Sequence, residues 1–240
     1  LVELVGLDRE WVPKTIGTSL YVRPVIMASE PFLGVRPAKS YIYYVILSPV
    51  GAYYPEGMAP VKIRVEEKYV RAVDGGLGAA KTGANYAASL AAGEEAKHEG
   101  FTQVLWLDGV HRKYIDEVGT MNIMVRIGDE VLTPELGGTI LPGVTRDSVL
   151  TLLREWGVKA TERPVTIEEV AEAHRNGQLA EVFGTGTAAV ISPVGELAYQ
   201  GRRMVIKDGG IGPLTQRLYG AIVGIQYART PDPPLWTLEV

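Results

Sequence analysis

A glycine-rich loop that runs into a helix is the feature that most constrains this chain. Residues 71–90 read RAVDGGLGAAKTGANYAASL, and they follow a run with the alternation of a β-strand. The neighbours of Lys81 are small and uncharged, so they bring no competing charge and little bulk. A lysine kept from water in this way becomes a usable amine nucleophile. The stretch therefore predicts a strand, a lysine-bearing loop and a helix in succession.

Three interpretations of Lys81 are open at this point. The first is a surface lysine at the start of a helix, because most lysines are solvated. The second is a nucleotide phosphate-binding loop, since Gly75, Lys81 and Thr82 match GxxxxGK[ST], although Ala80 replaces the second glycine. The apolar run that ends at Asp108 would then resemble the acidic strand end that helps to hold magnesium. The third is a lysine that forms a Schiff base with a carbonyl cofactor.

Composition excludes several classes of partner. The 240 residues are 46% hydrophobic and 22% charged, which is ordinary for a globular protein, and the net charge is −4. A polyanion such as nucleic acid, or an anionic membrane surface, requires clustered basic residues, so neither is expected. No apolar run reaches the roughly 18–20 residues needed to cross a bilayer. The absence of cysteine excludes disulfides and thiolate metal sites and fits a cytoplasmic protein, and the three histidines have no ligand spacing that would indicate a metal.

The pattern of prolines and glycines predicts two domains. Residues 19–28 and 41–47 read as strands, the second as a buried one because it is almost continuously apolar. A stretch rich in proline and glycine follows, which we interpret as an interdomain linker at 49–60. We therefore expect a smaller domain at 1–48 and a larger one at 61–240.

The larger domain is predicted to be α/β, with strands and helices interspersed. Its expected elements are strands at 61–71 and 102–107, a hairpin of 122–127 and 130–133 with a Gly-first turn, a turn at 183–189, and helices at 86–98, from about 147 to Trp156, 167–176 and 214–227. The helix at 167–176 has a capping box in Thr166 and Glu169.

Two segments offer backbone amides to an anion. Gly143, Val144 and Thr145 open a predicted helix, and the small-residue turn at 183–189 adds threonine hydroxyls. The alternatives are that the first segment is only the start of a helix and that the second is only a tight hairpin, with no anion bound at either. Taken alone, Glu117 is expected to be a solvated loop carboxylate.

Arg23 stands out in an otherwise apolar strand. It is spaced to share a strand face with Tyr21. Two roles are open for it, pairing with a carboxylate at the sheet edge or binding the carboxylate of a substrate.

Several blocks, in order along nearly the whole chain, resemble the branched-chain amino acid aminotransferases, which are class IV pyridoxal-phosphate enzymes. The blocks are YVRP (21–24), SPVGAYY (48–54), KTGANY (81–86), EVGTMN (117–122), LPGVTR (141–146) and EVFGTGTAAVISPVG (181–195). The resemblance implies a two-domain fold whose large domain has mixed sheets in a pseudo-barrel flanked by helices. It also implies pyridoxal 5′-phosphate as cofactor and a homodimer, and it leaves little support for the nucleotide-binding loop.

The resemblance implies a role for each matching residue. Lys81 would form the Schiff base with the cofactor and move the substrate proton, Glu117 would bind the pyridine nitrogen, and Tyr86 would bind the ring oxygen. The phosphate would take amides from 143–145, a threonine hydroxyl and the guanidinium of Arg71. The full cofactor set is Arg71, Lys81, Tyr86, Glu117, Thr120, Asn122, Leu141, Gly143, Val144, Thr145, Gly186 and Thr187.

The implied reaction transfers the amino group of leucine, isoleucine or valine to 2-oxoglutarate. Tyr21, Arg23 and Tyr53 would surround the substrate side chain, and Arg23 would pair with the second carboxylate of glutamate, which an apolar pocket rejects. The α-carboxylate would lie near Thr120, Thr187 and Ala188.

Other functions stay open beside this one. Within the class these are a D-amino acid aminotransferase and aminodeoxychorismate lyase, and outside it a P-loop nucleotide hydrolase or a non-catalytic homologue. Members of the resembled family carry a longer N-terminal part, so we expect this chain to retain most of the cofactor site and only part of the substrate cleft.

Overall fold

The computed structural model describes residues 1–15, 17–51, 58–232 and 235–240, and these belong to two compact units. The first unit is Leu1–Pro55 with Thr237–Val240, and the second is Glu56–Trp236. The division falls inside the segment 49–60 that we predict to be a linker. Because 52–57 lie outside the described residues, the linker and the exact domain limits stay predictions.

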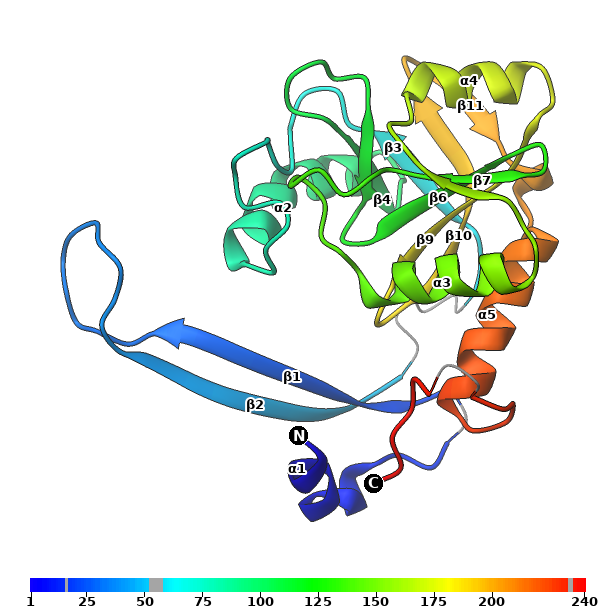
Figure 1. Ribbon diagram of the computed structural model, residues 1–240. Coiled ribbons are helices and arrows are strands. Elements are labelled where there is room, and N and C mark those ends of the chain that lie inside the picture. The colour runs from blue at the N-terminus through cyan, green and yellow to red at the C-terminus, as the bar shows by residue number, and fades with distance from the viewer. Residues whose placement is uncertain (16, 52–57, 233–234) are drawn as a thin grey trace. The chain divides into compact units, whose positions relative to one another are not determined.

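The first unit is a long β-ribbon preceded by a short helix. α1 (Val2–Leu7) and the 3-10 turn η1 (Arg9–Trp11) lead into β1 (Ser19–Ala28), which pairs antiparallel with β2 (Tyr41–Val50). Figure 1 shows the two strands as one extended hairpin.

The apolar run at 41–47 forms a strand, but the prediction that it is buried was wrong. Tyr41, Ile42, Tyr43 and Tyr44 are exposed. A continuous apolar run indicates a strand covered on both faces, and the described residues of the first unit place no second layer over this two-stranded ribbon. The sequence pattern therefore predicted the strand correctly, but it wrongly predicted that other residues cover both of its faces.

The second unit contains a single mixed sheet in the part of the chain that the structure describes. Its order is β5-β4-β3-β10-β9-β6-β7-β8, with β11 paired to β10. The β3–β4, β3–β10 and β7–β8 pairs are parallel, and the others are antiparallel. The strands are β3 (Val61–Val65), β4 (Gln103–Leu107), β5 (Ile115–Val118), β6 (Asn122–Ile127), β7 (Glu130–Thr133), β8 (Ala160–Glu162), β9 (Leu179–Gly186), β10 (Val190–Tyr199) and β11 (Arg202–Val205).

β10 is the strand at which the sheet curls. Its first half pairs with β9, its second half pairs with β3 and β11, and the register shifts between Val194 and Glu196. A Cβ at the intervening Gly195 would lie 2.9 Å from Pro60 Cβ and 3.2 Å from the carbonyl oxygen of Gly209. Glycine therefore permits the close approach of backbone at this bend. The bend gives the curled mixed sheet with flanking helices that we predicted for this fold class.

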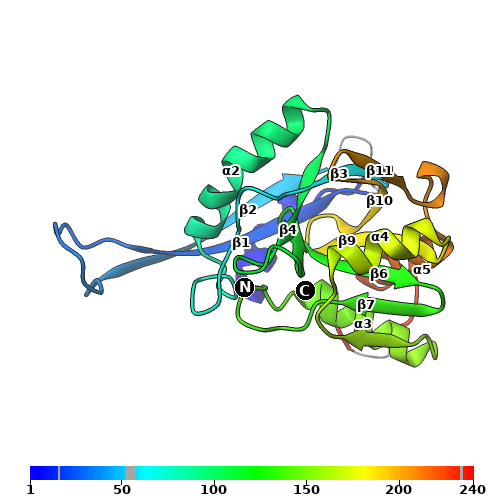
Figure 2. The same cartoon turned by 90° about the horizontal axis from the view of Figure 1, so that it is seen from above.

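Helices flank the sheet (Figures 1 and 2). α2 lies beside β4, α4 packs against β6 and β9, and α3 and α5 pack together on β9 and β10. The helices are α2 (Gly83–His98), α3 (Val144–Glu155), α4 (Ile167–Arg175) and α5 (Pro213–Gln226), with a 3-10 turn η2 (Lys207–Gly209). Among the described residues, none of the helices combines the length and the apolar character that spanning a bilayer requires.

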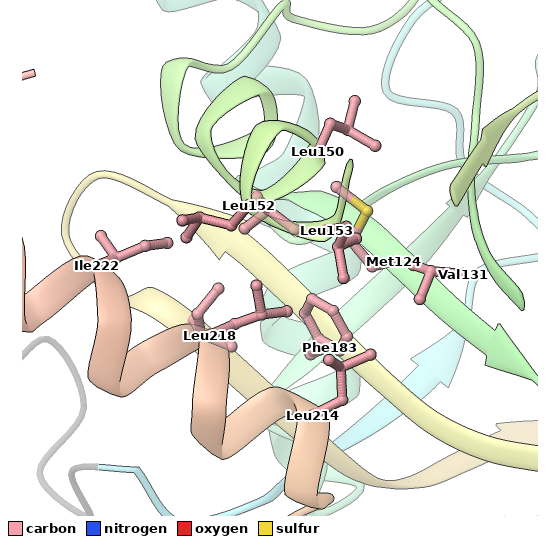
Figure 3. Close-up of a cluster of buried hydrophobic side chains, with 11 residues drawn as sticks. Met124, Val131, Leu150, Leu152, Leu153, Phe183, Leu214, Leu218 and Ile222 are labelled. Carbon is pink, nitrogen blue, oxygen red and sulfur yellow. The ribbon is translucent and has the colours of Figure 1, made fainter. Parts of the chain in front are cut away.

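The larger core lies between the α3 and α5 pair and the sheet. Figure 3 shows leucines of both helices lying around Phe183 of β9, together with Met124 and Val131 of the neighbouring strands. Phe183 and Leu153 are completely buried. The cluster fixes α3, whose first turn lies at one end of the predicted cofactor site.

Local signals placed most elements correctly, and some of them need correction. The hairpin has Gly128 with φ of 57°, as a Gly-first turn requires, and Thr166 accepts a hydrogen bond from the amide of Glu169 at the start of α4. β3 ends at Val65 rather than at residue 71, because the buried carboxylate of Glu66 accepts the amides of Lys68 and Tyr69 and turns the chain.

The other corrections concern element limits in the segments nearest the predicted site. The small-residue turn covers Thr187–Ala189 only, since residues 183–186 belong to β9, where 183–185 pair with β6 and Gly186 pairs with Val190 of β10. Two helices also begin earlier than predicted, α2 at Gly83 rather than at Tyr86 and α3 at Val144 rather than near residue 147.

We expect Leu153→Ala to destabilise the chain by about 2–5 kcal/mol, because it removes a fully buried side chain from a packed core. Urea unfolding followed by circular dichroism measures the change. Leu90→Ala is the matched control, since Leu90 lies on helix α2 and is 66% exposed. It should change stability by no more than about 0.5 kcal/mol. Equal effects of the two substitutions would contradict the core described above.

Candidate active site

The loop between β3 and α2 is held against the loop that precedes α3. The amide of Ala79 donates to the carbonyl of Gly138 at 3.0 Å, and Arg71 Nη2 donates to the carbonyls of Gly78, at 3.1 Å, and Thr139. A Cβ at Gly78 would lie 2.2 Å from the carbonyl oxygen of Thr139. The two loops touch through backbone at this point, so a side chain has no room here.

Asn85 fixes the end of the loop from within α2, and sequence reasoning missed it. The side chain is buried, and its Nδ2 donates to the carbonyls of Leu77 at 2.7 Å and Ala80 at 2.8 Å. These bonds satisfy two carbonyls of the loop segment that directly precedes Lys81. An asparagine in the first helical turn, four residues after a lysine in a glycine-rich loop, is the only signal that the sequence offers for this role.

Lys81 reaches the hydroxyl of Tyr86. Its Nζ lies 2.8 Å from the tyrosine oxygen and 5.5 Å from the ring centroid. The spacing of five residues brings the two side chains together because Lys81 precedes the helix and Tyr86 lies in its first turn. The expectation that small neighbours desolvate Lys81 was wrong for the described chain, since the side chain is exposed. Because the neighbouring side chains are small, they do not cover the amine, which stays exposed to water.

Glu117 is a buried strand residue, so its assignment as a solvated loop carboxylate was wrong. It lies in β5 and is 3% exposed. Its Oε1 accepts the amide of Leu141 at 2.8 Å and lies 3.2 Å from Arg71 Nη2. Burial raises the pKa of Glu117 to about 7, while Arg71 and the Leu141 amide act in the opposite direction.

A second buried acid lies next to it in β5. Asp116 Oδ1 accepts the hydroxyl of Thr139 at 3.2 Å, and its Oδ2 has no hydrogen-bond partner among the described residues. Burial raises the pKa of Asp116 to about 6. An isolated aspartate in an apolar strand gives no sequence signal that separates it from a solvated residue, and Asp116 was missed.

One pocket gathers six of the predicted cofactor residues. It is lined by Arg71, Ala80, Lys81, Asn85, Tyr86, Ser89, Glu117, Gly119, Thr120 and Leu141. The amine, the phenol and the buried carboxylate thus face one space within the second unit. Ala80, Asn85, Ser89 and Gly119 are lining residues that sequence reasoning did not select.

The start of α3 lies at the edge of the same region. Gly143 is the N-cap, and no side chain caps the helix. Asn122 Nδ2 donates to the carbonyl of Leu141 at 2.8 Å, and its Oδ1 would lie 2.1 Å from a Cβ at Gly143. Asn122 is also paired across the sheet with Thr185, two residues before Thr187. The first amides of α3 and the β9–β10 turn therefore lie close to the same strand end.

The remaining predicted residues fall outside this pocket. Thr187 and Ala188 are exposed in the β9–β10 turn. Tyr21 and Arg23 belong to the first unit and do share a strand face, with Arg23 Nη2 3.3 Å from the Tyr21 hydroxyl. Tyr53 lies outside the described residues. Within the described ranges, no group of histidine and acidic side chains could hold a metal ion.

A model of the amino-transferase class IV family matches residues 3–197. The chain belongs to this family. Class IV aminotransferases depend on pyridoxal phosphate, and this membership overturns the P-loop hydrolase as an alternative.

A comparison over the whole sequence shows which members of the family the chain resembles. The chain is 54% identical to branched-chain-amino-acid aminotransferase 2 of Bacillus subtilis (strain 168), over all of its own length and 66% of that protein. The chain thus spans about two thirds of the length of this relative.

Two solved structures share the fold. A branched-chain amino acid aminotransferase from Escherichia coli aligns over 98% of this chain and 75% of that one, with a TM-score of 0.80 and 31% identity. The branched-chain amino acid aminotransferase from Thermobaculum terrenum, solved in its PLP-form, aligns over 95% of this chain and 69% of that one. Its TM-score is 0.76 and its identity is 23%, so this second likeness shows the fold alone. The class IV resemblance seen in the sequence is confirmed.

The chemistry of the donors fits the cofactor of class IV aminotransferases. Lys81 supplies an amine to the pocket for an aldehyde, and Glu117 Oε2 has no partner among the described residues, which leaves it for a protonated ring nitrogen. The uncapped first turn of α3 offers amides to a phosphate. The residues present therefore suit the aldehyde, the ring nitrogen and the phosphate of pyridoxal phosphate.

We expect Gly78→Ala to destabilise the chain by about 1–3 kcal/mol, because the added Cβ would overlap the backbone of Thr139. Thermal unfolding measures the loss. Gly83→Ala is the control, since nothing lies within 4 Å of a Cβ there and the residue starts a helix. A Gly78→Ala chain as stable as the wild type would show that the loops do not meet as described.

We expect Glu117→Gln to change how stability depends on pH. An acid whose pKa is raised by folding contributes stability that is fully present below its unfolded value and is lost as pH rises through its folded value. For Glu117 this window runs from about 4.5 to about 7. The Tm of the Gln variant, relative to the wild type, should therefore rise across this window. The Tm of Glu94→Gln, a substitution at an exposed position of α2, should change with pH as the Tm of the wild type does. If the Tm of Glu117→Gln also followed the wild type at every pH, the raised pKa of Glu117 would be contradicted.

Proposed function

We propose that the chain binds pyridoxal 5′-phosphate and transfers the amino group of leucine, isoleucine or valine to 2-oxoglutarate. The observation that carries the proposal is the gathering of Lys81, Tyr86 and the buried Glu117 around one pocket. The 54% identity to a branched-chain-amino-acid aminotransferase over the whole chain supports the substrate class. A cytoplasmic homodimer, implied by the family resemblance, is part of the same proposal.

Each residue of the pocket has a task that follows from its contacts. When bound, the cofactor supplies an electron sink for the carbon that carries the substrate amine. Lys81 is the amine that bonds to the cofactor and, when free, carries a proton to and from that carbon. Its exposed side chain has the freedom that such an exchange of positions requires.

Tyr86 and Glu117 hold the cofactor ring in this proposal. The Tyr86 oxygen accepts a hydrogen bond from Lys81 Nζ, so its own O–H remains available to an oxygen on the ring. Glu117 Oε1 is occupied by Leu141 and Arg71, and Oε2 is the acceptor for the ring nitrogen. The phenol and the carboxylate would thereby orient the ring through two different atoms, its oxygen and its nitrogen.

The start of α3 and the β9–β10 turn are assigned to anionic groups. The amides of Gly143, Val144 and Thr145 and the hydroxyl of Thr187 are proposed for the cofactor phosphate, with the positive end of the helix dipole. Thr120, Thr187 and Ala188 are proposed for the α-carboxylate of the substrate. Asn122, Leu141 and Gly186 would support this region through backbone and side-chain contacts.

Arg23 is proposed as the group that selects 2-oxoglutarate and glutamate as the second substrate pair. Its guanidinium lies 5.0 Å from the centroid of the Tyr21 ring and has no carboxylate partner among the described residues. A charged group of this kind can pair with a second carboxylate, whereas Tyr21 and Tyr53 would offer aromatic surface to branched aliphatic side chains.

We expect the wild-type chain to develop a long-wavelength absorption band on addition of pyridoxal phosphate, and L-leucine to convert this band to that of pyridoxamine phosphate. Lys81→Ala should lose the band and at least about a hundredfold of the rate of amino transfer, the lower range for a positioned proton-transfer group. Visible spectroscopy and formation of L-glutamate from 2-oxoglutarate measure the two effects.

Lys97→Ala is the control, because Lys97 is exposed at the other end of α2. It should behave as the wild type. Turnover of D-alanine but not of L-leucine would replace the proposal with a D-amino acid aminotransferase, and a band that survives Lys81→Ala would refute the assigned lysine.

A further inference from the structure

Arg71 is engaged with Glu117 rather than with the start of α3. The side chain is buried, and its Nη2 contacts Glu117 Oε1 and the carbonyls of Gly78 and Thr139. The described contacts of Arg71 include none to residues 143–145. The family resemblance placed this guanidinium at the cofactor phosphate, and the contacts place it behind the carboxylate that faces the ring.

The surroundings make Arg71 the main positive charge available to this carboxylate. Glu117 is faced by Arg71, by the amide of Leu141, by the neighbouring acid Asp116, and at longer range by Lys81. Lys81 is exposed and engaged with Tyr86, and Asp116 is itself an acid. A buried carboxylate stays ionised only when it is paired and hydrogen-bonded.

We propose that Arg71 is a positioning residue for Glu117, which fixes Oε1 and keeps the carboxylate ionised with Oε2 turned to the pocket. The inference rests on the proposed function, because it assigns Arg71 to the state of the group that would hold the cofactor ring. Two backbone carbonyls hold the guanidinium in place, so its position does not depend on the carboxylate alone.

Electrostatics supports this role. Burial raises the pKa of Glu117 to about 7, and the Arg71 charge is the largest effect that opposes it. Without that charge the pKa of Glu117 would rise still further, and the protonated acid would predominate at neutral pH. A neutral acid would donate to a ring nitrogen rather than accept from it, and the ring would no longer carry the proton that makes it a strong electron acceptor.

The test measures the protonation of the ring nitrogen directly. Pyridoxal phosphate labelled with ¹⁵N in the ring is bound to the chain, and its nitrogen chemical shift is followed against pH. In Arg71→Gln, the pH at which the ring nitrogen loses its proton should fall by about 1–3 units, the range for loss of an opposite charge at contact distance. Arg71→Lys, which keeps the charge, should recover most of the wild-type behaviour.

A double substitution shows whether Arg71 acts through Glu117. Glu117→Gln alone should also lower the titration midpoint, and adding Arg71→Gln to it should have little further effect. Additive shifts would overturn the proposal. Arg112→Gln is the matched control, because Arg112 Nη1 likewise donates to two backbone carbonyls, those of Lys68 and Tyr69, with no carboxylate partner among the described residues.

The ³¹P signal of the bound cofactor distinguishes the remaining alternative, in which Arg71 binds the phosphate. If Arg71 is instead a phosphate ligand, Arg71→Gln will leave the ring nitrogen unchanged and alter the ³¹P titration of the bound phosphate. That result overturns the inference and leaves the proposed function intact, since the cofactor is still bound. Failure of the wild type to bind pyridoxal phosphate at all would overturn both. Should Arg71→Gln not fold, Arg71→Lys decides through the ³¹P signal, because the inference expects this signal to match the wild type whereas an altered phosphate ligand would move it.

Discussion

The contact between the loop after β3 and the loop before α3 is the constraint on which the candidate site depends. Gly78 lies directly against Thr139, and Arg71 donates across the junction to both of their carbonyls. The first loop carries Lys81 and leads to Tyr86, whereas the second loop supplies the Leu141 amide to Glu117. If the loops separated, the amine and the carboxylate would lose their common pocket. The absence of a side chain at one glycine therefore matters as much to the site as any charged group.

The bend in β10 explains how distant segments reach this junction. Because β10 pairs with β9 over one half and with β3 over the other, it joins the strands that carry the α3 side of the site to those that carry the α2 side. β5 lies at the β3 end of this order, and its two acids are buried there. β6 lies at the β9 end and begins with Asn122, which supports the start of α3. A flat sheet in the same order would hold these groups much further apart.

The sequence predicted what local chemistry determines and missed what depends on tertiary surroundings. The Thr166 cap, the Gly128 turn and the helix opened by Gly143 were found because their signals lie within a few residues. Tyr41–Leu47 was wrongly assigned as buried, since an apolar run does not show whether another layer covers it. The strand at 61–71 was predicted too long, because only folding buries Glu66 and turns its carboxylate onto the following amides. The same limit explains the errors at Lys81 and Glu117, whose exposure depends on loops far apart in the sequence. Family resemblance named six of the residues that line the pocket and missed four others, and it could not show that the Arg71 guanidinium lies against Glu117.

Two buried acids beside a single guanidinium make the fold less stable than apolar residues at the same positions would. A buried ion pair rarely stabilises a fold as well as packed apolar residues would, and an unpaired buried acid costs more. Asp116 and Glu117 both have raised pKa values from burial, and only Glu117 has the Arg71 side chain at contact distance. Perturbed acids of this kind gather at functional sites, where the protein tolerates their cost for a required charge state. Glu117 lines the pocket, but Asp116 does not. The asymmetry places the guanidinium on the acid that lines the pocket, while Asp116 accepts the hydroxyl of Thr139.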